Sequence, residues 1–160
     1  MSTEDAPLPT PPRIDGPSPH ILIVRAPYYR EVVDGLSEGA TRLLRAAGAT
    51  FEVIDVAGAF ELPQALRIAT RANRHFDGFL ALGCVVKGET DHYDFICQAT
   101  MHGLMQVSLQ FGLAMGAGLL TVDTLAQAEA RSRIDGFNKG AEAAAAALLQ
   151  VGAARRLGAS

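Results

Sequence analysis

The sequence has 160 residues, of which 49% are hydrophobic and 19% are charged, and its net charge is −3 at pH 7. This length fits one domain, and the composition predicts a packed core over most of the chain. Nucleic-acid binding needs a concentrated basic surface, and the basic residues here are scattered, so we expect no nucleic-acid partner. A small anionic ligand stays compatible with the charge, because one or two Arg or Lys side chains can hold it.

The two cysteines and the first residues of the chain bear on the compartment. Cys84 and Cys97 sit among apolar residues, which predicts two buried, reduced thiols. No CxxC motif and no zinc-like His/Cys spacing occurs, so we predict no metal site. The start of the chain lacks the pattern of a signal peptide, and no apolar run is long enough to cross a bilayer. We therefore expect a cytoplasmic protein without a membrane partner.

A proline-rich segment precedes the first predicted element. Its prolines are Pro7, Pro9, Pro11, Pro12, Pro17 and Pro19. Such a composition favours an extended or mobile chain over a packed one. We predict a mobile tail over residues 1–19 and a single domain over residues 20–160.

Apolar patterns of strand and helix type alternate from residue 20 onward. Strands are predicted at 20–24, 51–56, 79–86 and 115–122. Helices are predicted at 33–47 with Gly48 as terminator, at 62–72, after residue 91 with an apolar stripe of Cys97, Met101, Leu104 and Met105, at 124–131 with Thr124 as cap, and at 141–149. This order predicts an α/β fold: a single-domain, three-layer, flavodoxin-like sandwich with a four-stranded parallel sheet and helices on both faces.

Parallel sheets of this kind bind ligands beyond the carboxyl ends of their strands. That rule selects the segments 25–29, 57–61, 84–92 and 117–123. The chain has no GxGxxG sequence and no Walker lysine loop, which argues against dinucleotide and nucleoside triphosphate chemistry.

The densest polar cluster is the loop Lys87-Gly88-Glu89-Thr90-Asp91-His92, between a strand end and a helix start. Thr90 or Asp91 can cap the helix there, and backbone N–H groups at a helix start can hold an anion. His92 can act as an acid or a base near neutral pH, although a capped helix with a solvated histidine explains the pattern equally well.

The carboxylates of this loop oppose a bound phosphate, so a cation from elsewhere is needed besides Lys87. Arg131 and Arg133 are candidates, and their alternative role is pairing with the dipole at a helix end.

Two other strand ends carry candidate ligand groups. Gly58 permits close approach of a ligand to the backbone, and Glu61 can accept hydrogen bonds, although a glutamate there more often serves the helix dipole. Tyr28 and Tyr29 follow the first strand, where either stacking on a planar ligand or simple packing accounts for them.

Four motifs follow one another along the chain. They are an aromatic residue after the first strand, Gly58-Ala59-Phe60-Glu61-Leu62-Pro63, Leu82-Gly83-Cys84-Val85-Val86-Lys87-Gly88-Glu89-Thr90-Asp91-His92-Tyr93-Asp94, and Asn138-Lys139-Gly140. The third is long and uncommon, so chance explains it poorly. In these motifs the chain resembles the lumazine synthase family from about Ile21 to Leu149.

The resemblance implies a transferase of riboflavin biosynthesis, acting at the penultimate step. The implied reaction condenses 5-amino-6-(D-ribitylamino)uracil with 3,4-dihydroxy-2-butanone 4-phosphate to give 6,7-dimethyl-8-ribityllumazine, phosphate and water. An amine of the pyrimidine forms an imine with the ketone, phosphate leaves, and ring closure with loss of water completes the product. The resemblance implies no cofactor.

The resemblance also implies roles for individual residues. His92 matches the histidine that transfers protons. The implied contacts to the ribitylaminouracil come from Tyr28 as the stacking aromatic, Ala59, Phe60, Glu61, Cys84, Val85, Val86 and Ala117. The implied contacts to the phosphate come from the backbone N–H groups of Glu89 and Thr90 and from the Arg131 side chain.

Sites in this family form between neighbouring subunits, so the resemblance implies a homopentamer, with a decamer or an icosahedral shell as alternatives. The turn 132–137 lacks the Gly and Lys pattern typical of shells, which favours the pentamer. Two positions depart from the family pattern: Ala117 stands where many relatives have Phe, and Pro27 replaces a frequent Arg. Both departures predict weaker ligand binding.

Other function classes stay open on the sequence. The chain can be a paralogue that binds flavin or lumazine without turnover, or a structural protein that forms a compartment. The presence of His92 and Arg131 speaks against the binding paralogue, and the structural protein stays open. A flavodoxin-like electron carrier fits least, because no Ser/Thr-rich phosphate loop follows the first strand.

Overall fold

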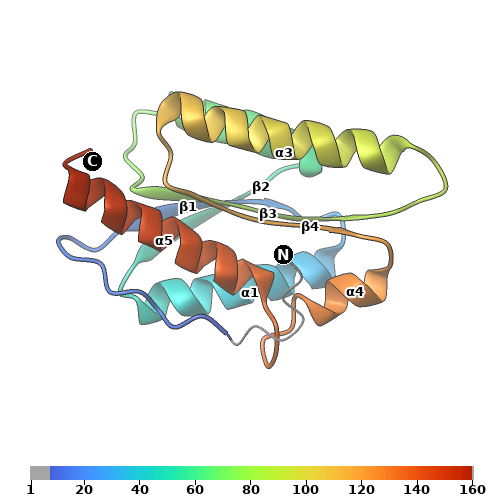
Figure 1. Cartoon of the computed structure of the whole chain (residues 1–160), viewed down its shortest axis with the longest axis horizontal. Helices are drawn as coiled ribbons and strands as arrows, with labels where there is room; N and C mark the ends of the chain where they lie inside the picture. Colours follow the sequence, from blue (N-terminus) through green and yellow to red (C-terminus); the bar gives the residue numbers. More distant parts are fainter. Residues whose placement is uncertain (1–7, 160) are drawn as a thin grey trace.

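The computed structural model describes residues 8–159, and it has three layers. Figure 1 shows a four-stranded sheet between two layers of helices. One layer contains α1 (Arg30–Ala46), α4 (Leu125–Ala130) and α5 (Lys139–Leu157). The other contains α2 (Leu62–Ala69) and α3 (His92–Phe111), with the short 3-10 helix η1 (Ala59–Glu61) leading into α2.

The sheet is entirely parallel, with the strand order β2-β1-β3-β4. Its strands are β1 (His20–Ala26), β2 (Thr50–Asp55), β3 (Gly78–Val86) and β4 (Met115–Val122). The central strands β1 and β3 are buried along most of their length, whereas the edge strand β2 is largely open. Continuous apolar runs belong to strands covered on both faces, which is why the sequence located β1 and β3. The predicted α/β sandwich is confirmed.

Helix ends follow capping residues where the chain provides them. The Thr124 side chain accepts a hydrogen bond from the Gln127 N–H, and the Gln127 side chain accepts one from the Thr124 N–H, so α4 begins with a capping box. Gly48 follows α1 with φ +74°, in the left-handed region that glycine adopts without strain.

The predicted boundaries of three helices were wrong. α1 begins at Arg30 instead of residue 33. α2 ends at Ala69 instead of residue 72, because the chain turns there through hydrogen bonds from Arg71 to Ile68 and from Ala72 to Ala69. α5 begins two residues earlier than predicted and continues to Leu157 instead of residue 149. The added residues after 149 are mostly good helix formers, and no proline interrupts them.

The segment 8–19 forms no helix or strand, and its Ile14 packs against the core beside α5. The Arg155 guanidinium donates hydrogen bonds to the carbonyl oxygens of Asp15 at 2.9 Å and Pro17 at 2.8 Å, and to the Asp77 carboxylate at 3.1 Å. Arg155 therefore joins this segment to the end of α5 and to the start of β3. The first part of the predicted tail, residues 1–7, lies outside the described residues, and the mobility of the tail and the boundary at residue 20 remain predictions.

Glycine permits α5 to lie directly against its neighbours. A Cβ atom at Gly140 would be 1.9 Å from the backbone oxygen of Leu36 in α1. A Cβ atom at Gly116 of β4 would be equally close, 1.9 Å, to the backbone oxygen of Ala143 in α5. These contacts let helix and strand backbones touch, and they close the core around fully buried side chains such as Leu148.

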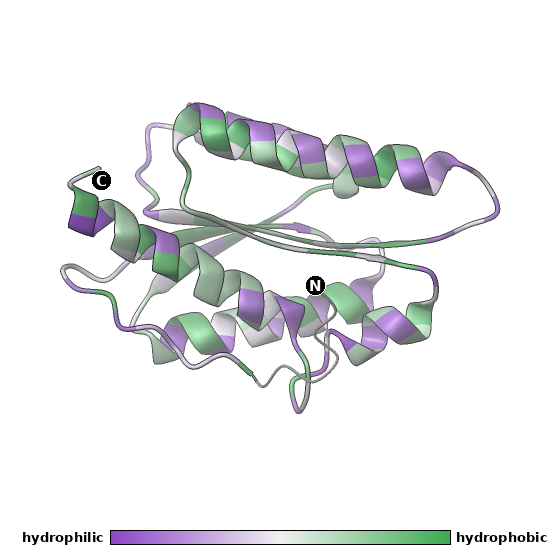
Figure 2. Cartoon of the chain, viewed as in Figure 1, coloured by the Kyte–Doolittle hydropathy of each residue, from purple (hydrophilic) through white to green (hydrophobic). Residues whose placement is uncertain are grey.

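α3 carries hydrophobic residues along its whole length, as Figure 2 shows. Its buried residues are Thr100, Leu104 and Val107. The apolar stripe predicted from the sequence does not face the sheet as a whole, because Met101 and Met105 are 45% and 58% exposed. A helix with apolar residues on several sides is typical of one that is covered on several sides. None of the helices described here is long and apolar enough to span a membrane.

Gly140→Ala is expected to destabilise the protein by about 1–3 kcal/mol, because the added methyl group meets backbone that cannot move aside. Urea denaturation at fixed protein concentration measures the change. Gly136→Ala is the matched control, since an added Cβ there meets no heavy atom within 4 Å and the residue has no positive φ. Equal unfolding midpoints for the two variants would contradict the close approach of α1 and α5.

Candidate active site

Three of the predicted ligand segments follow the carboxyl ends of neighbouring strands. Tyr28 comes after β1, η1 after β2, and the loop 87–91 after β3. η1 contacts both β3 and α3, so the second and third segments meet in space. The loop 87–91 forms the right-hand tip of the molecule in Figure 1.

The end of β3 offers backbone hydrogen-bonding groups to a ligand. The pairing of β3 with β1 ends at Gly83 and Ala26, whereas its pairing with β4 continues to Val86 and Val122. The residues 84–86 therefore project beyond β1, and their backbone groups on that side have no strand partner in the register. A flat ligand with N–H and C=O groups along its edge can pair with such a strand end.

Burial raises the pKa of both cysteine thiols, which is the opposite of what a nucleophilic thiol needs. Both thiols are free. Burial raises the pKa of the Cys84 thiol to about 11, so this thiol stays protonated at neutral pH. Cys97 on α3 is half-buried, which corrects the prediction that both thiols are buried.

Exposed aromatic side chains flank the end of β3. Tyr28 is 77% exposed, and its ring meets Tyr29 edge-on at a centroid distance of 5.2 Å. Phe60 in η1 is 50% exposed, and Glu61 beside it is half-buried. An aromatic residue that served only core packing would be buried, so the exposure of Tyr28 favours the stacking role.

The start of α3 leaves its first N–H groups open. Asp91 precedes the helix with φ −67° and ψ −4°, and no side-chain hydrogen bond caps α3. The prediction of a side-chain cap by Thr90 or Asp91 was therefore wrong. Its physical reason is that Asp91 already has helical dihedral angles, whereas a capping side chain needs an extended backbone. Uncapped N–H groups at a helix start can hold an anion.

His92 lies in this first turn and is exposed. Its imidazole forms no hydrogen bond or ion pair with any other residue between 8 and 159. No partner in this part of the chain holds either ring nitrogen, so the ring can take up or release a proton at a bound substrate.

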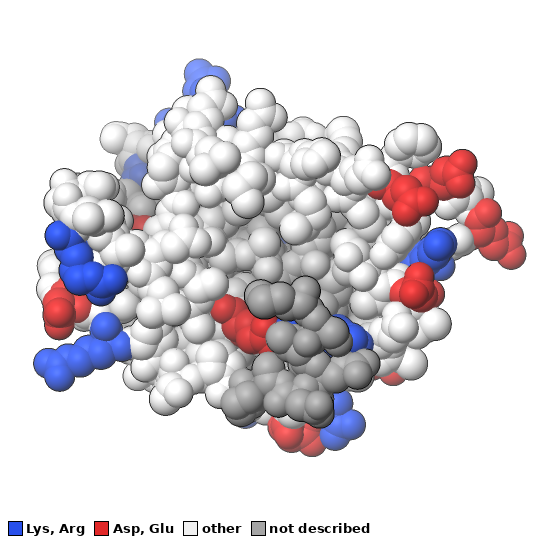
Figure 3. All heavy atoms as spheres, viewed as in Figure 1, with Lys and Arg blue, Asp and Glu red and all other residues white. Residues whose placement is uncertain are grey.

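Carboxylates outnumber cations around the loop after β3. Figure 3 shows acidic groups gathered at this end of the molecule, with a basic group among them. Within the loop, Lys87 is accompanied by Glu89 and Asp91, and all three are exposed. A phosphate bound at the start of α3 therefore needs a further cation from outside the loop.

Arg131 lies in the opposite helix layer from His92. It follows α4, and its guanidinium donates a hydrogen bond to the Gln127 carbonyl oxygen at 3.0 Å. The other candidate, Arg133, is exposed and paired with Asp135 at 2.9 Å. Lys139 was not singled out as a cation by the sequence pattern, but its N–H donates to the Arg131 carbonyl oxygen at 2.9 Å, so the two residues are neighbours.

Ala117 also lies away from the other candidate residues. It is the third residue of β4, where it pairs with Ala81 and is exposed on this edge strand. At roughly 3.3 Å per residue, its distance from the strand end at Val122 is about 16 Å. The segment 117–123 therefore reaches the carboxyl edge only with its last residues.

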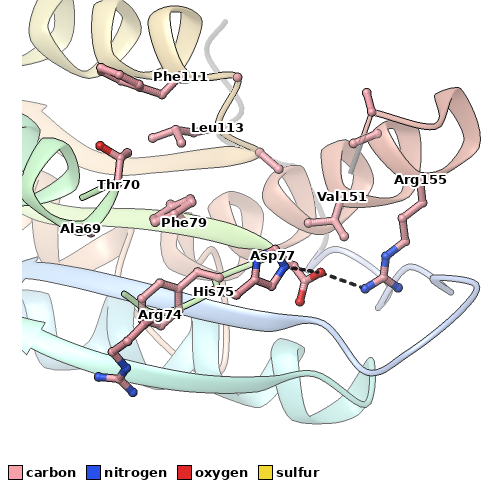
Figure 4. Close-up of a pocket in the computed structure, with 15 residues that line it drawn as sticks. Ala69, Thr70, Arg74, His75, Asp77, Phe79, Phe111, Leu113, Val151 and Arg155 are labelled. Atoms are coloured by element: carbon pink, nitrogen blue, oxygen red, sulfur yellow. Dashed lines mark hydrogen bonds and ion pairs between the residues drawn. The ribbon is translucent and has the colours of Figure 1, made fainter. Parts of the chain in front are cut away.

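A cavity of about 340 Å³ lies at the other end of the sheet, by the start of β3 and the ends of α3 and α5. Figure 4 shows Phe79, Phe111 and Val151 around it, with the Asp77–Arg155 ion pair at one side. Burial alone would raise the pKa of Asp77, but hydrogen bonds from the His20 N–H and Arg155 outweigh burial and lower it. No predicted ligand or catalytic residue lines this cavity. Because such sheets bind ligands at the carboxyl ends, we place the candidate active site there.

The candidate residues thus form two groups on one chain. Tyr28, η1, the end of β3 and His92 gather at the carboxyl ends, whereas Arg131 and Ala117 lie elsewhere. The first group can stack a planar ring, pair with its edge, hold an anion and move a proton. It lies open at the surface, however, and a ligand site normally encloses most of its ligand.

Comparison with known proteins agrees with these features. The model of the 6,7-dimethyl-8-ribityllumazine synthase family matches residues 18–155. A protein of that name from Bartonella tribocorum is 40% identical over 140 residues, covering 88% of this chain and 93% of its own. One from Nitrobacter hamburgensis is 42% identical over 149 residues, covering 91% of each chain. The 6,7-dimethyl-8-ribityllumazine synthase 1 of Rhizobium meliloti is 42% identical over 144 residues, covering 88% of this chain and 94% of its own. The chain therefore belongs to the 6,7-dimethyl-8-ribityllumazine synthase family.

Proposed function

We propose that this protein condenses 5-amino-6-(D-ribitylamino)uracil with 3,4-dihydroxy-2-butanone 4-phosphate to 6,7-dimethyl-8-ribityllumazine, in riboflavin biosynthesis. The observation that carries the proposal is the geometry where β3 ends and α3 begins. There a strand end with open backbone groups leads into an uncapped helix start with His92, which has no hydrogen-bond partner among residues 8–159. The family match over residues 18–155 indicates which reaction this site catalyses.

The pyrimidine substrate is planar and has alternating donors and acceptors on its edge. In the proposed complex, its ring stacks on Tyr28, and its edge pairs with backbone groups of Cys84, Val85 and Val86. Ala59, Phe60 and Glu61 lie beside this strand end, where Glu61 can accept hydrogen bonds from the ribityl hydroxyls. This orientation presents the 5-amino group to the second substrate.

The sugar phosphate binds at the start of α3. Backbone N–H groups at Glu89 and Thr90 and in the first turn of the helix hold its phosphate, and Arg131 supplies the cation that the loop lacks. His92 transfers protons as the imine forms and the phosphate leaves. Much of the acceleration comes from holding two substrates in reacting orientation, because this converts a bimolecular step into an intramolecular one.

The separation of Arg131 from His92 supports a site shared between two copies of the chain. The surface of α2 and α3 supports the same proposal, because it exposes large apolar side chains that a second copy would cover. These side chains are Ile68 at 71%, Phe95 at 69%, Met101 at 45%, Met105 at 58% and Leu109 at 75% exposure. We propose a homopentamer, the assembly that the family resemblance implies.

We also propose a cytoplasmic location and partners limited to small molecules and copies of the chain. Two free thiols in a folded chain suit a reducing compartment. The net charge of −3 supports the absence of a nucleic-acid partner.

His92→Ala is expected to fold and assemble normally, and to lower the rate of lumazine formation about 10²–10⁴-fold, the usual contribution of a proton-transfer group. Steady-state assays with both substrates measure the rate. His75→Ala is the matched control, because that side chain is 82% exposed at the opposite end of the sheet. A rate equal to that of the unchanged protein would remove His92 from the mechanism.

Arg131→Ala is expected to raise the KM for the sugar phosphate much more than the KM for the pyrimidine. The loss of a charge-assisted contact to phosphate costs about 1.5–3 kcal/mol, or roughly 10- to 150-fold in affinity. Arg133→Ala, two residues away and paired with Asp135, serves as control and should change neither KM. Equal effects of Arg131→Ala on both substrates would indicate a structural role at the end of α4.

Assayed at a sugar phosphate concentration well below the KM of Arg131→Ala, a mixture of His92→Ala and Arg131→Ala subunits, co-expressed or refolded together, is expected to be more active than either variant alone. When the site takes His92 from one subunit and Arg131 from the next, a mixed assembly contains some sites with both residues intact. Sedimentation confirms that the mixture has assembled. Activity no higher than the average of the two variants would place both residues in the same chain's site.

A further inference from the structure

Asn138 is a buried polar residue immediately before α5, and 1% of its surface is exposed. Its Oδ1 accepts a hydrogen bond from the Ala141 N–H at 2.9 Å and so caps α5. Its Nδ2 donates to the carbonyl oxygens of Gly35 at 3.0 Å, Ser132 at 3.0 Å and Arg133 at 3.3 Å. One amide thus joins α1, α5 and the loop that connects α4 with α5.

That loop carries the cation of the proposed phosphate site. Ser132 and Asn138 form an antiparallel bridge across the loop, and the Lys139 N–H donates to the Arg131 carbonyl oxygen at 2.9 Å. Arg131 and Lys139 therefore leave the backbone at adjacent points of one closed loop. The Asn138 amide lies inside the loop and holds its two arms together.

Two glycines of α1 make room for this arrangement. A Cβ atom at Gly39 would lie 2.1 Å from Asn138 Oδ1, and one at Gly35 would lie 2.4 Å from the Ser132 carbonyl oxygen. Both distances are far shorter than a van der Waals contact. α1 therefore presents a glycine surface on which the loop is seated.

The asparagine amide serves both sides of position 138: its oxygen caps α5, and its two N–H hydrogens face three carbonyl oxygens. A serine can accept from the Ala141 N–H, but its single hydroxyl hydrogen cannot reach three carbonyl oxygens. An aspartate can cap the helix equally well, but it places a charged carboxylate against those oxygens. Helix capping uses only the oxygen of the amide, so the N–H donors of Asn138 serve to hold the loop.

We propose that Asn138 is a positioning residue for phosphate binding, which acts by holding the loop 131–138 and thereby the Arg131 side chain in place. The proposal rests on the proposed role of Arg131 toward the sugar phosphate. Asn138 itself contacts no substrate, because it is buried between α1, α5 and the loop.

Asn138→Ser tests the proposal in the full-length assembled protein, because it keeps the helix cap and removes the donors to the loop. The KM for the sugar phosphate is expected to rise about tenfold, since a displaced guanidinium loses part of its charge-assisted bond. The KM for the pyrimidine and kcat should change little. The inhibition constant of inorganic phosphate, measured against the sugar phosphate, should rise in the same proportion.

Two comparison variants separate the possible outcomes. Val151→Ala removes core volume on α5, three turns or more beyond the loop, so it lowers stability without a selective change in either KM. Arg131→Ala tests the role of Arg131 on which this proposal rests. If it leaves the KM for the sugar phosphate unchanged, the proposed phosphate role of Arg131 fails. If Arg131→Ala raises this KM and Asn138→Ser does not, only the positioning role of Asn138 fails.

Gly39→Ala disturbs the Asn138 amide from the neighbouring helix α1. It therefore tests the proposal if Asn138→Ser does not assemble. Its methyl group would displace the Asn138 side chain, so the same selective rise in the KM for the sugar phosphate is expected. If an assembled Asn138→Ser or Gly39→Ala protein shows no selective rise in the KM for the sugar phosphate, the proposal is overturned.

Discussion

The pairing of β1 with β3 in the centre of the sheet is the constraint on which the rest of the structure depends. Both strands are covered on both faces, so their backbone groups must pair within the sheet and their side chains must be apolar. Parallel pairing also sends every strand end to the same edge. β3 extends beyond the end of β1, so that edge exposes backbone groups of residues 84–86. The loop that leads to His92 begins directly after them.

The same layering divides the candidate site. His92 starts a helix on one face of the sheet, and Arg131 ends a helix on the other. A single chain cannot bring the two together without breaking the sheet between them, whereas a second copy can supply the missing half. The apolar side chains that α3 exposes fit this division, because burying them against another copy would stabilise the proposed assembly.

Local sequence signals succeeded where the physical cause was itself local. Thr124 and Gln127 form the capping box that their spacing predicts, and Gly48 has the positive φ that ends α1. The polar loop after β3 is exposed as expected. Prediction failed where the outcome depended on backbone conformation or on packing, which the residue pattern does not record. Asp91 does not cap α3, because the chain reaches it in a helical conformation, and the methionines of α3 turn away from the sheet.

By itself, the sequence determined the order of strands and helices, the parallel sheet, the family, and the residues offered for chemistry. These follow from periodicity and from short motifs, which depend on neighbours along the chain. Only the tertiary structure decided that Arg131 and His92 lie in different layers and that Asn138 joins three elements. Gly35 and Gly39 belong to no motif of the sequence, and the Asn138-Lys139-Gly140 motif does not show which backbone Gly140 contacts. Their meaning depends on contacts between backbones far apart along the chain, which no local pattern records.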